Sequence, residues 1–327
     1  MKRNIVCFTL CALFFALGAS AQAQPSAKGP RIGFLLASSR GVNTTRTAAF
    51  LQGLRELGYD EGKNIVIEWR VADGKLDRLP SLAADLVGLK VDVIVTAGPA
   101  DTRAAKQATN TIPIVMTFDS DPVANGLVAS LARPGGNITG LSTLAPELSG
   151  KQLELLKESI PNLSRVAIVG NSKNPGNALV LKELQGAADA LKMKLRSLDV
   201  LDSKDIGLAF RAASKEGAGA ILMLGSPLVN LQRKQIIELA VKHRLPAMYY
   251  TADWVEAGGL MTYGVSRMDL ARRAATYVDK ILKGTKPADL PVEQPKKFEF
   301  IINLKAAKQI GLTIPPNVLA RADRVIQ

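Results

Sequence analysis

Residues 91–142 read VDVIVTAGPADTRAAKQATNTIPIVMTFDSDPVANGLVASLARPGGNITGLS, and this stretch decides the fold. Two short apolar runs, 91–96 and 112–118, are rich in β-branched residues and are bounded by residues that break regular structure. Such runs are typical of strands that are buried on both faces of a parallel sheet. Residues 100–108 lie between them with a helical pattern, so the stretch predicts a strand, a helix and a second parallel strand.

Small, polar and acidic residues follow both predicted strands. The first strand ends in 96–99 (TAGP) and the second in 118–122 (FDSDP). In parallel sheets ligands bind beyond the carboxyl ends of the strands, so we expect both turns to face one crevice. Residues 133–137 (RPGGN) form a breaker cluster, after which a new set of alternating elements begins. The chain is therefore expected to pass there into a second lobe, with a cleft between the lobes.

Strands and helices alternate along the rest of the chain. The predicted fold class is α/β, with two doubly wound parallel-sheet lobes. Further strands are expected at 31–37, 64–70, 165–170, 194–200, 218–224, 246–250, 259–263 and 297–302. Further helices are expected at 44–57, 77–88, 147–160, 177–191, 204–215, 228–243, 267–283 and 306–310.

Residues 1–23 have the pattern of a secretory signal peptide. Lys2 and Arg3 form a short basic region, residues 5–18 are apolar, and small residues follow. The apolar run is shorter than the ~20 residues that a membrane span needs. We therefore expect export to the periplasm, with the signal peptide cleaved near Ala21 or Ala23.

The charge and the cysteine content narrow the class of protein. The chain has 42 Lys and Arg against 29 Asp and Glu, a formal net charge of +13, and the basic residues are spread along it. This pattern indicates a solvated basic surface, so no nucleic-acid partner is expected. Cys7 and Cys11 both lie in the signal peptide, which leaves no cysteine in the mature chain for a disulfide, a reactive thiolate or a metal site.

Motifs of the common α/β enzymes are missing from the sequence. The first predicted strand is not followed by G-x-G-x-x-G, and the chain has neither a Walker A loop nor a G-x-S-x-G elbow. His243 is the single histidine, which argues against a zinc site or a Ser–His triad. We therefore expect a protein that is not an enzyme and that uses no cofactor and no metal.

Hydroxyl and backbone N–H groups ahead of helices are the first set of candidate ligand contacts. Ser38, Ser39, Thr96, Ala97 and Ser226 each lie in a turn between a predicted strand and the next helix. The free N–H groups and partial positive charge of a helix N-terminus could hold a carboxylate or another anion. The same hydroxyl groups are also good helix caps, so a purely structural role stays open.

Carboxylates and an aromatic ring form the second set of candidates. Asp119, Asp121 and Asp253 follow predicted strands and could balance a ligand amine or hydroxyl group. Asp121 precedes Pro122 and could instead cap a following helix. Tyr250 could stack on a flat or ring-shaped ligand, although such rings are often part of the core.

Several segments, in this order, resemble one family. They are 121–123 (DPV), 126–128 (GLV), 130–131 (SL), 134–137 (PGGN), 139–140 (TG), 263–264 (YG), 281–284 (ILKG), 288–293 (ADLPVE), 302–307 (INLKAA), 311–316 (GLTIPP) and 322–323 (AD). Together they resemble the ABC transporter substrate-binding proteins whose better-understood members bind aromatic amino acids. The resemblance covers essentially the whole mature chain.

The resemblance implies a type I periplasmic binding protein fold, in which two doubly wound lobes are joined by a three-segment hinge and hold a ligand in their cleft. On that fold we expect lobe 1 to comprise residues 31–120 plus 265–290, and lobe 2 residues 121–264 plus 291–327. The ligand-contacting positions that the resemblance implies are Ser38, Ser39, Thr96, Ala97, Asp119, Asp121, Asn171 and Ser226.

The implied function is that of the solute-binding subunit of an ABC importer. Such a subunit, expected here as a monomer, would capture a small polar or amino-acid-like ligand and deliver it to an ABC permease in the inner membrane. Two alternatives stay open: a periplasmic sensor that presents the solute to a membrane receptor, and a periplasmic enzyme of similar fold. A transcription regulator of similar fold would need a DNA-binding headpiece where this chain has a signal peptide.

Overall fold

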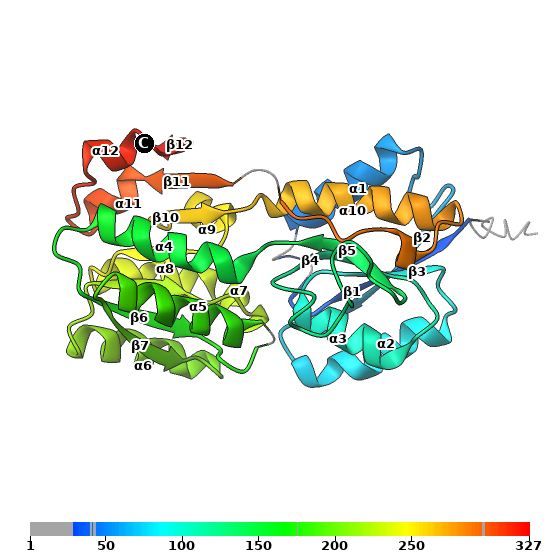
Figure 1. The fold of residues 1–327 in the computed structure, drawn as a ribbon, viewed down its shortest axis with the longest axis horizontal. Helices are drawn as coiled ribbons and strands as arrows, with labels where there is room; N and C mark the ends of the chain where they lie inside the picture. Colours follow the sequence, from blue (N-terminus) through cyan, green and yellow to red (C-terminus); the bar gives the residue numbers. More distant parts are fainter. Residues whose placement is uncertain (1–28, 40, 42–43, 175, 296–297) are drawn as a thin grey trace, which may run out of the picture.

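The structure is a computed structural model that describes residues 29–327 except 40, 42–43, 175 and 296–297. Two lobes lie side by side along the long axis of the molecule (Figure 1). Each lobe is built around one mainly parallel sheet, which confirms the predicted fold class. The signal peptide predicted at residues 1–23 lies outside the described residues.

In the described part of lobe 1, five strands form a parallel sheet in the order β2-β1-β3-β4-β5. The strands are β1 (Arg31–Leu36), β2 (Val66–Val71), β3 (Val93–Thr96), β4 (Ile114–Asp119) and β5 (Ile138–Ser142). One face is covered by α1 (Thr44–Glu56) and α10 (Arg267–Leu282) (Figure 1). The other face is covered by α2 (Leu79–Gly88), with the short 3-10 helix η2 (Leu76–Arg78) before it, and by α3 (Pro99–Ala108).

The central strands of lobe 1 bury both of their faces. Phe34 of β1 and Val95 of β3 pack in the cluster under α1 and α10. Their neighbours Leu35 and Ile94 pack in the opposite cluster, under α2 and α3. Because successive residues of a strand point to opposite faces, both positions must be apolar. This explains why the sequence of these strands is a continuous apolar run.

Helix α10 comes from late in the chain but packs closely on α1. A Cβ atom added at Gly53 of α1 would lie 2.5 Å from the carbonyl oxygen of Arg272 in α10. Glycine at this position therefore allows the two helix backbones to approach each other. The contact joins two helices of lobe 1 that lie more than 200 residues apart in sequence.

In the described part of lobe 2, seven strands lie in the order β12-β11-β10-β9-β8-β6-β7, and all neighbours are parallel except β10 and β11. The strands are β6 (Arg165–Gly170), β7 (Lys194–Asp199), β8 (Ala220–Met223), β9 (Ala247–Tyr249), β10 (Met261–Gly264), β11 (Glu299–Asn303) and β12 (Arg324–Ile326). The helices are α4 (Ala145–Ser159), α5 (Asn177–Ala190), α6 (Ser203–Lys215), α7 (Pro227–Leu231), α8 (Arg233–Lys242), α9 (Ala252–Glu256), α11 (Leu304–Gln309) and α12 (Pro316–Leu319).

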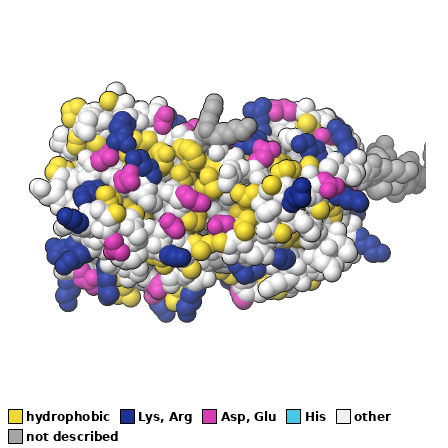
Figure 2. All heavy atoms as spheres, in the orientation of Figure 1, with side chains coloured by type: hydrophobic (Ala, Val, Ile, Leu, Met, Phe, Trp, Pro, Cys, Tyr) yellow, Lys and Arg dark blue, Asp and Glu magenta, His cyan; other side chains and the backbone are white. Residues whose placement is uncertain are grey.

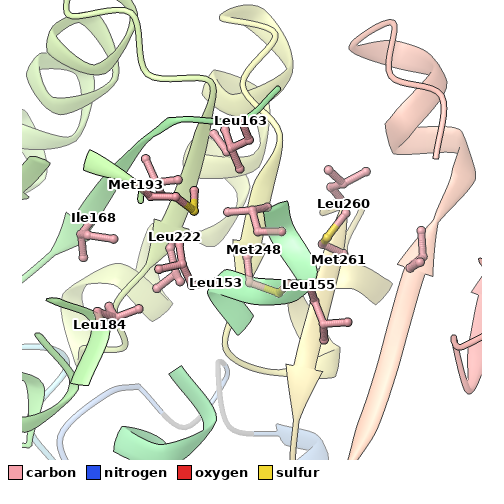
Figure 3. Packing of buried hydrophobic residues seen from close by; sticks show 14 of the residues in the cluster. Leu153, Leu155, Leu163, Ile168, Leu184, Met193, Leu222, Met248, Leu260 and Met261 are labelled. Atoms are coloured by element: carbon pink, nitrogen blue, oxygen red, sulfur yellow. The ribbon is translucent and has the colours of Figure 1, made fainter. Parts of the chain in front are cut away.

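One core cluster of lobe 2 lies between its sheet and the helices α4 and α5. Figure 3 shows Leu153 of α4 and Leu184 of α5 beside Leu222 of β8 and Met248 of β9. All four side chains are buried from solvent. Burial of apolar surface on this scale is the main force that holds helices on a sheet.

The chain passes from one lobe to the other three times (Figure 1). The first crossing follows β5 and the second joins β10 to α10. The third lies between Glu293, which pairs with Leu141 in lobe 1, and β11 in lobe 2. These crossings confirm the expected three-segment hinge. The short 3-10 helix η3 (Pro287–Asp289) lies between α10 and the third crossing.

The lobe boundaries differ from those expected. Strand β5 pairs with β4, and Leu127 and Val128 lie in the core of lobe 1, so residues 121–142 lie with lobe 1 rather than lobe 2. Val292 also packs in the core of lobe 1. The breaker cluster at 133–137 is therefore a turn into another strand of the same sheet, and the chain leaves lobe 1 only after Ser142.

Other elements also differ from the sequence-based prediction. The residues after Asp121 form turns rather than a helix. The helix expected at 228–243 is divided at Gln232 into α7 and α8. Residues after 310, where no element is predicted, contain the short helix α12 and the edge strand β12, which pairs with β11 and extends the sheet of lobe 2.

The charged residues are dispersed over the surface. Figure 2 shows Lys and Arg side chains scattered over both lobes on the face in view, with Asp and Glu among them. This distribution agrees with the solvated basic surface that the sequence indicates. In the part of the chain that the structure describes, no helix is long and apolar enough to cross a membrane.

Candidate ligand-binding site

A cavity of about 120 Å³ lies between the lobes and is lined by both. Lobe 1 contributes the ends of β1, β3 and β4, and lobe 2 contributes the ends of β8 and β9 and the start of α5. Apolar side chains such as Phe118, Leu222 and Val265 form much of the wall. The site thus lies where the carboxyl ends of parallel strands from two sheets face each other, as the strand-end rule predicts.

Four of the predicted site residues line the cavity. Ser38 follows β1, Ala97 follows β3, Ser226 follows β8 and Tyr250 follows β9. Ser226 also caps α7, because its Oγ accepts a hydrogen bond from the backbone N–H of Val229 at 3.2 Å. Ser226 therefore caps a helix and lines the cavity at the same time.

Three other predicted residues are near these turns but do not line the cavity. The Thr96 hydroxyl shares a 2.7 Å hydrogen bond with that of Thr102, and Ser39 is next to Ser38 in sequence but is not part of the wall. Asn171 orders its own turn: its Oδ1 accepts from the backbone N–H of Lys173 at 2.8 Å. Its carbonyl oxygen accepts from Nδ2 of Asn177, a residue that does line the cavity.

Asp119 and Asp121 are used within the loop that follows β4. Asp119 Oδ1 accepts from the Nδ2 of Asn125 at 2.7 Å and from the N–H of Asp121 at 3.0 Å. Asp121 Oδ1 in turn accepts from the N–H groups of Val123 and Ala124. The structure places neither carboxylate on the cavity wall. Asp121 caps a turn and not the helix that was expected, since the following residues are not helical.

Asp119 is nevertheless an unusual group. It is fully buried, and its Oδ2 has no hydrogen-bond donor among the described residues. Burial raises the pKa of Asp119 to about 6, although Asn125 and the Asp121 N–H favour the charged form. A neutral carboxyl is tolerated better than a charge in such a place.

Asp253 links the two lobes. Its Oδ2 accepts from Nη2 of Arg233, on α8 of lobe 2, at 2.8 Å and from Nη2 of Arg46, on α1 of lobe 1, at 3.3 Å. Burial alone would raise the pKa of Asp253, but Arg46 and Arg233 outweigh it and hold that pKa at about 2. Asp253 is thus ionised and contacts protein groups rather than the cavity, while Arg46 lines the cavity.

Arg267, at the start of α10, brings a second cation to the cavity wall. Its guanidinium carbon lies 4.0 Å from the ring centroid of Phe118 in lobe 1 and 5.4 Å from that of Tyr250 in lobe 2. Burial lowers the pKa of Arg267 to about 10, so the group keeps its charge at neutral pH. The two rings hold the guanidinium group by cation–π contact.

Asp101 is the acidic side chain on the described wall. It is 2% exposed, and its Oδ2 accepts from the N–H of Ala97 at 3.1 Å. Burial raises the pKa of Asp101 to about 7 against the opposing effect of hydrogen bonds from the backbone of Ala97 and Ala37. At neutral pH a large fraction of this carboxyl group is therefore uncharged.

Amide side chains complete the polar part of the wall. Asn230 accepts a 2.7 Å hydrogen bond from the Tyr250 hydroxyl through its Oδ1. Asn177 donates to the carbonyl oxygen of Gly225 at 3.1 Å, and Gln152 donates to that of Tyr263 at 2.7 Å. These contacts fix the side chains in place before any ligand arrives, which lowers the entropic cost of binding.

The lobes are in close contact beside the cavity. A Cβ atom at Gly74 of lobe 1 would lie 2.5 Å from Leu231 Cδ1 of lobe 2. A Cβ atom at Gly176 of lobe 2 would lie 2.0 Å from the Ser120 Oγ of lobe 1. Together with the Arg46–Asp253 pair, these contacts show that the cleft is closed in this structure.

The sequence missed Arg46, Asp101, Phe118 and Arg267 as site residues. Phe118 lies at the carboxyl end of β4, and Asp101 lies in the first turn of α3, which follows β3. The strand-end rule applied more widely would therefore have included both. Arg267 likewise follows a strand, β10, at the start of a helix. Arg46 also lies in the first turn of a helix, α1, but it is farther along the chain from the end of its strand at Leu36 than Asp101 is from Thr96, so the strand-end rule identifies it less directly.

Two doubly wound lobes, three crossings and a closed cavity between the lobes define a solute-binding protein of the type I periplasmic binding protein class. The chain belongs to the ABC transporter substrate binding protein family, whose model matches residues 40–326. This family membership confirms the resemblance that the sequence motifs indicate.

Individual relatives agree with this assignment. The chain is similar to a tyrosine-binding protein of Clostridioides difficile, 27% identical over 266 residues, which are 80% of this chain and 75% of that protein. It is similar to the structure of a conserved domain protein from Vibrio cholerae, with 32% identity and a TM-score of 0.85. It is also similar to the structure of an ABC domain from Streptococcus pneumoniae in complex with L-Trp, with 25% identity and a TM-score of 0.85. Each structural match covers 91% of this chain and 100% of the other.

Proposed function

We propose that this protein is the solute-binding subunit of an ABC importer. It captures a small polar or amino-acid-like ligand between its lobes and delivers it to a permease in the inner membrane. The observation that carries the proposal is the cavity lined by both lobes, because a ligand bound there contacts both lobes only when they are closed. A ligand that favours one arrangement of the lobes shifts the population toward it.

The size and lining of the cavity support a small ligand with an apolar part. Its volume of about 120 Å³ is close to that of cavities of about 150 Å³ that take up benzene. Phe118, Leu222 and Val265 offer apolar surface, while Ser38 and Asn177 offer polar groups. This combination of an apolar wall with a few polar groups at fixed positions is typical of ligand-binding sites. One relative is named a tyrosine-binding protein and another was solved in complex with L-Trp, so amino acids are the first compounds to test.

We also propose that the mature protein works as a monomer in the periplasm, after removal of residues 1–23. The basic and apolar pattern of that segment supports export. The mass of the protein from a periplasmic extract tests cleavage near Ala21 or Ala23. Recovery of the full-length chain in the membrane fraction would contradict it.

Binding is tested by a thermal-shift screen of the mature protein against amino acids, carboxylic acids, amines, sugars and nucleosides. A ligand that binds the native state raises the unfolding temperature by mass action. Compounds that do so are then titrated calorimetrically. If no compound class shifts the unfolding temperature, the proposed binding function fails.

Delivery to a permease is tested by uptake of the labelled ligand in cells that lack this protein. Uptake should fall and should return with the wild-type gene. A variant that folds but does not bind should not restore it. Unchanged uptake in the deletion strain would favour a sensor role over import, since binding is common to both.

A further inference from the structure

Arg267 presents a charge to the cavity without a protein counter-ion. In the described part of the chain no carboxylate lies within ion-pair distance of its guanidinium group, whose contacts are the rings of Phe118 and Tyr250. Both rings line the cavity, so the charge between them faces it. Because a desolvated charge is costly unless it is paired, this position favours an anionic partner from the ligand.

The charges around the cavity strengthen this preference. Arg46 and Arg233 share a single carboxylate, that of Asp253. Burial raises the pKa of Asp101, the acidic group on the described wall, to about 7, so a large fraction of it is uncharged near pH 7. Three guanidinium groups therefore face one firmly ionised carboxylate, and the cavity carries an excess of positive charge. An anion bound there gains Coulomb energy that a cation would lose.

The geometry of Arg267 suits one type of anion. A guanidinium group is a planar fork of N–H donors that matches the two oxygens of a carboxylate. The packing between two rings restricts the orientation of this fork before binding. The neighbouring wall is apolar at Phe118, Leu222 and Val265, so the remainder of the ligand lies against hydrocarbon.

We infer that the ligand is a small carboxylate with an apolar body, and that Arg267 binds its carboxylate group while a ligand ammonium group is dispensable. This inference rests on the proposed binding function and narrows it. An amino acid is one member of this ligand class, but the described wall has no ionised acid dedicated to an ammonium group. Asp101 already accepts a hydrogen bond from the backbone N–H of Ala97.

Two matched sets of four compounds test the inference by calorimetric titration. The aromatic set is 3-phenylpropanoate, L-phenylalanine, 2-phenylethylamine and 3-phenylpropanamide. The aliphatic set is 4-methylpentanoate, L-leucine, 3-methylbutylamine and 4-methylpentanamide. In at least one set, the simple carboxylate should bind within about tenfold of the amino acid or better, and the amine and the amide at least about tenfold more weakly.

Substitution at Arg267 tests the assigned role directly. Arg267→Met keeps a long side chain between the rings and removes the charge. It should weaken binding of the carboxylate by roughly 10- to 100-fold and leave the amide within about threefold, so the preference for carboxylate over amide disappears. Arg267→Lys keeps the positive charge but lacks the planar N–H donors of a guanidinium group, so its affinity for the carboxylate should lie between those of wild type and Arg267→Met. Arg272→Gln, on the same helix but exposed and paired with Glu56, is the matched control and should bind as wild type does.

The outcomes separate this inference from the proposed function. Amine binding as tight as carboxylate binding, or amino-acid binding without binding of the simple carboxylate, overturns the inference. So does an Arg267→Met or Arg267→Lys variant that keeps the full preference for carboxylate over amide. If the wider screen yields a sugar or another ligand without a carboxylate, the binding function stands and the inference falls. If no compound binds, both fall.

Discussion

The ion pair between Arg46 and Asp253 is expected to stabilise the closed arrangement of the lobes. Arg46 belongs to lobe 1, Asp253 to lobe 2, and their side chains are 9% and 20% exposed. Opening the cleft separates them but leaves Asp253 paired with Arg233, which is in the same lobe. Arg46→Met should therefore shift the population toward open forms without leaving an unpaired carboxylate.

The magnitude follows from the distance and the burial. Two unit charges 4 Å apart attract by about 4 kcal/mol at the effective dielectric constant of a protein surface. Desolvation offsets much of this, and hydrogen bonds to charged groups contribute a net ~1.5–3 kcal/mol. We take the lower value, about 1.5 kcal/mol, because the 3.3 Å contact is long and Arg233 remains. The expected loss of ligand affinity is then about tenfold.

A double-mutant cycle of Arg46→Met and Asp253→Asn isolates the pair. Calorimetric titration with the tightest ligand of the screen should give a coupling free energy of about 1.5 kcal/mol. Small-angle scattering of ligand-free Arg46→Met should give a larger radius of gyration than wild type. A coupling below about 0.5 kcal/mol, within the usual error of additivity, together with an unchanged radius would refute the assigned role.

Three other predictions concern single groups. The affinity for 3-phenylpropanoate should fall as pH rises through about 7, because burial raises the pKa of Asp101 to about 7 and a bound anion favours the neutral form of that group. Calorimetric titrations from pH 6 to 8.5 check this, and a constant affinity over that range contradicts it. Asp119→Asn should change ligand affinity less than about twofold, because Asp119 is off the cavity wall, and a loss above about tenfold in the same assay would mean that its carboxylate contacts the ligand. Gly53→Ala should lower the free energy of unfolding by about 2 kcal/mol in urea titrations, because the added Cβ would meet the Arg272 carbonyl oxygen. Gly186→Ala in α5 has open space for a Cβ and should raise the free energy of unfolding by up to about 1 kcal/mol, so equal effects of the two variants would contradict the close approach of α1 and α10.

Much of the fold could be predicted because its strands carry their own signal. The runs at β3 and β4 are apolar and β-branched, since both faces of these strands are buried. Strand β5 has the sequence ITGLS, which is short and contains Gly140 in a left-handed conformation. A Cβ at Gly140 would lie 2.2 Å from the Met116 carbonyl oxygen, so glycine is required by the neighbouring strand. The sequence of this segment resembles a loop, which is why the lobe boundary predicted at residue 121 falls before β5.

The candidate site was predictable in position but only partly in its chemistry. The strand-end rule located Ser38, Ala97, Ser226 and Tyr250, which line the cavity. It could not show that the side chain of Asp119, the last residue of β4, accepts hydrogen bonds from Asn125 and Asp121, because these partners lie in the loop that follows. Contacts such as Arg46 to Asp253, 207 residues apart, exist only when the two lobes meet, so they leave no local pattern in the sequence.

The interleaving of the chain between lobes has a consequence for synthesis. Lobe 1 is complete only when α10 covers α1 and the face of its sheet, and α10 begins 125 residues after β5 ends at Ser142. At about 5–20 residues per second, ribosomes need on the order of ten seconds to cover that distance. Lobe 2 in turn needs β11 and β12 from the end of the chain. Neither lobe can be finished early, so a nascent chain stalled before residue 267 holds two incomplete cores with exposed apolar surface.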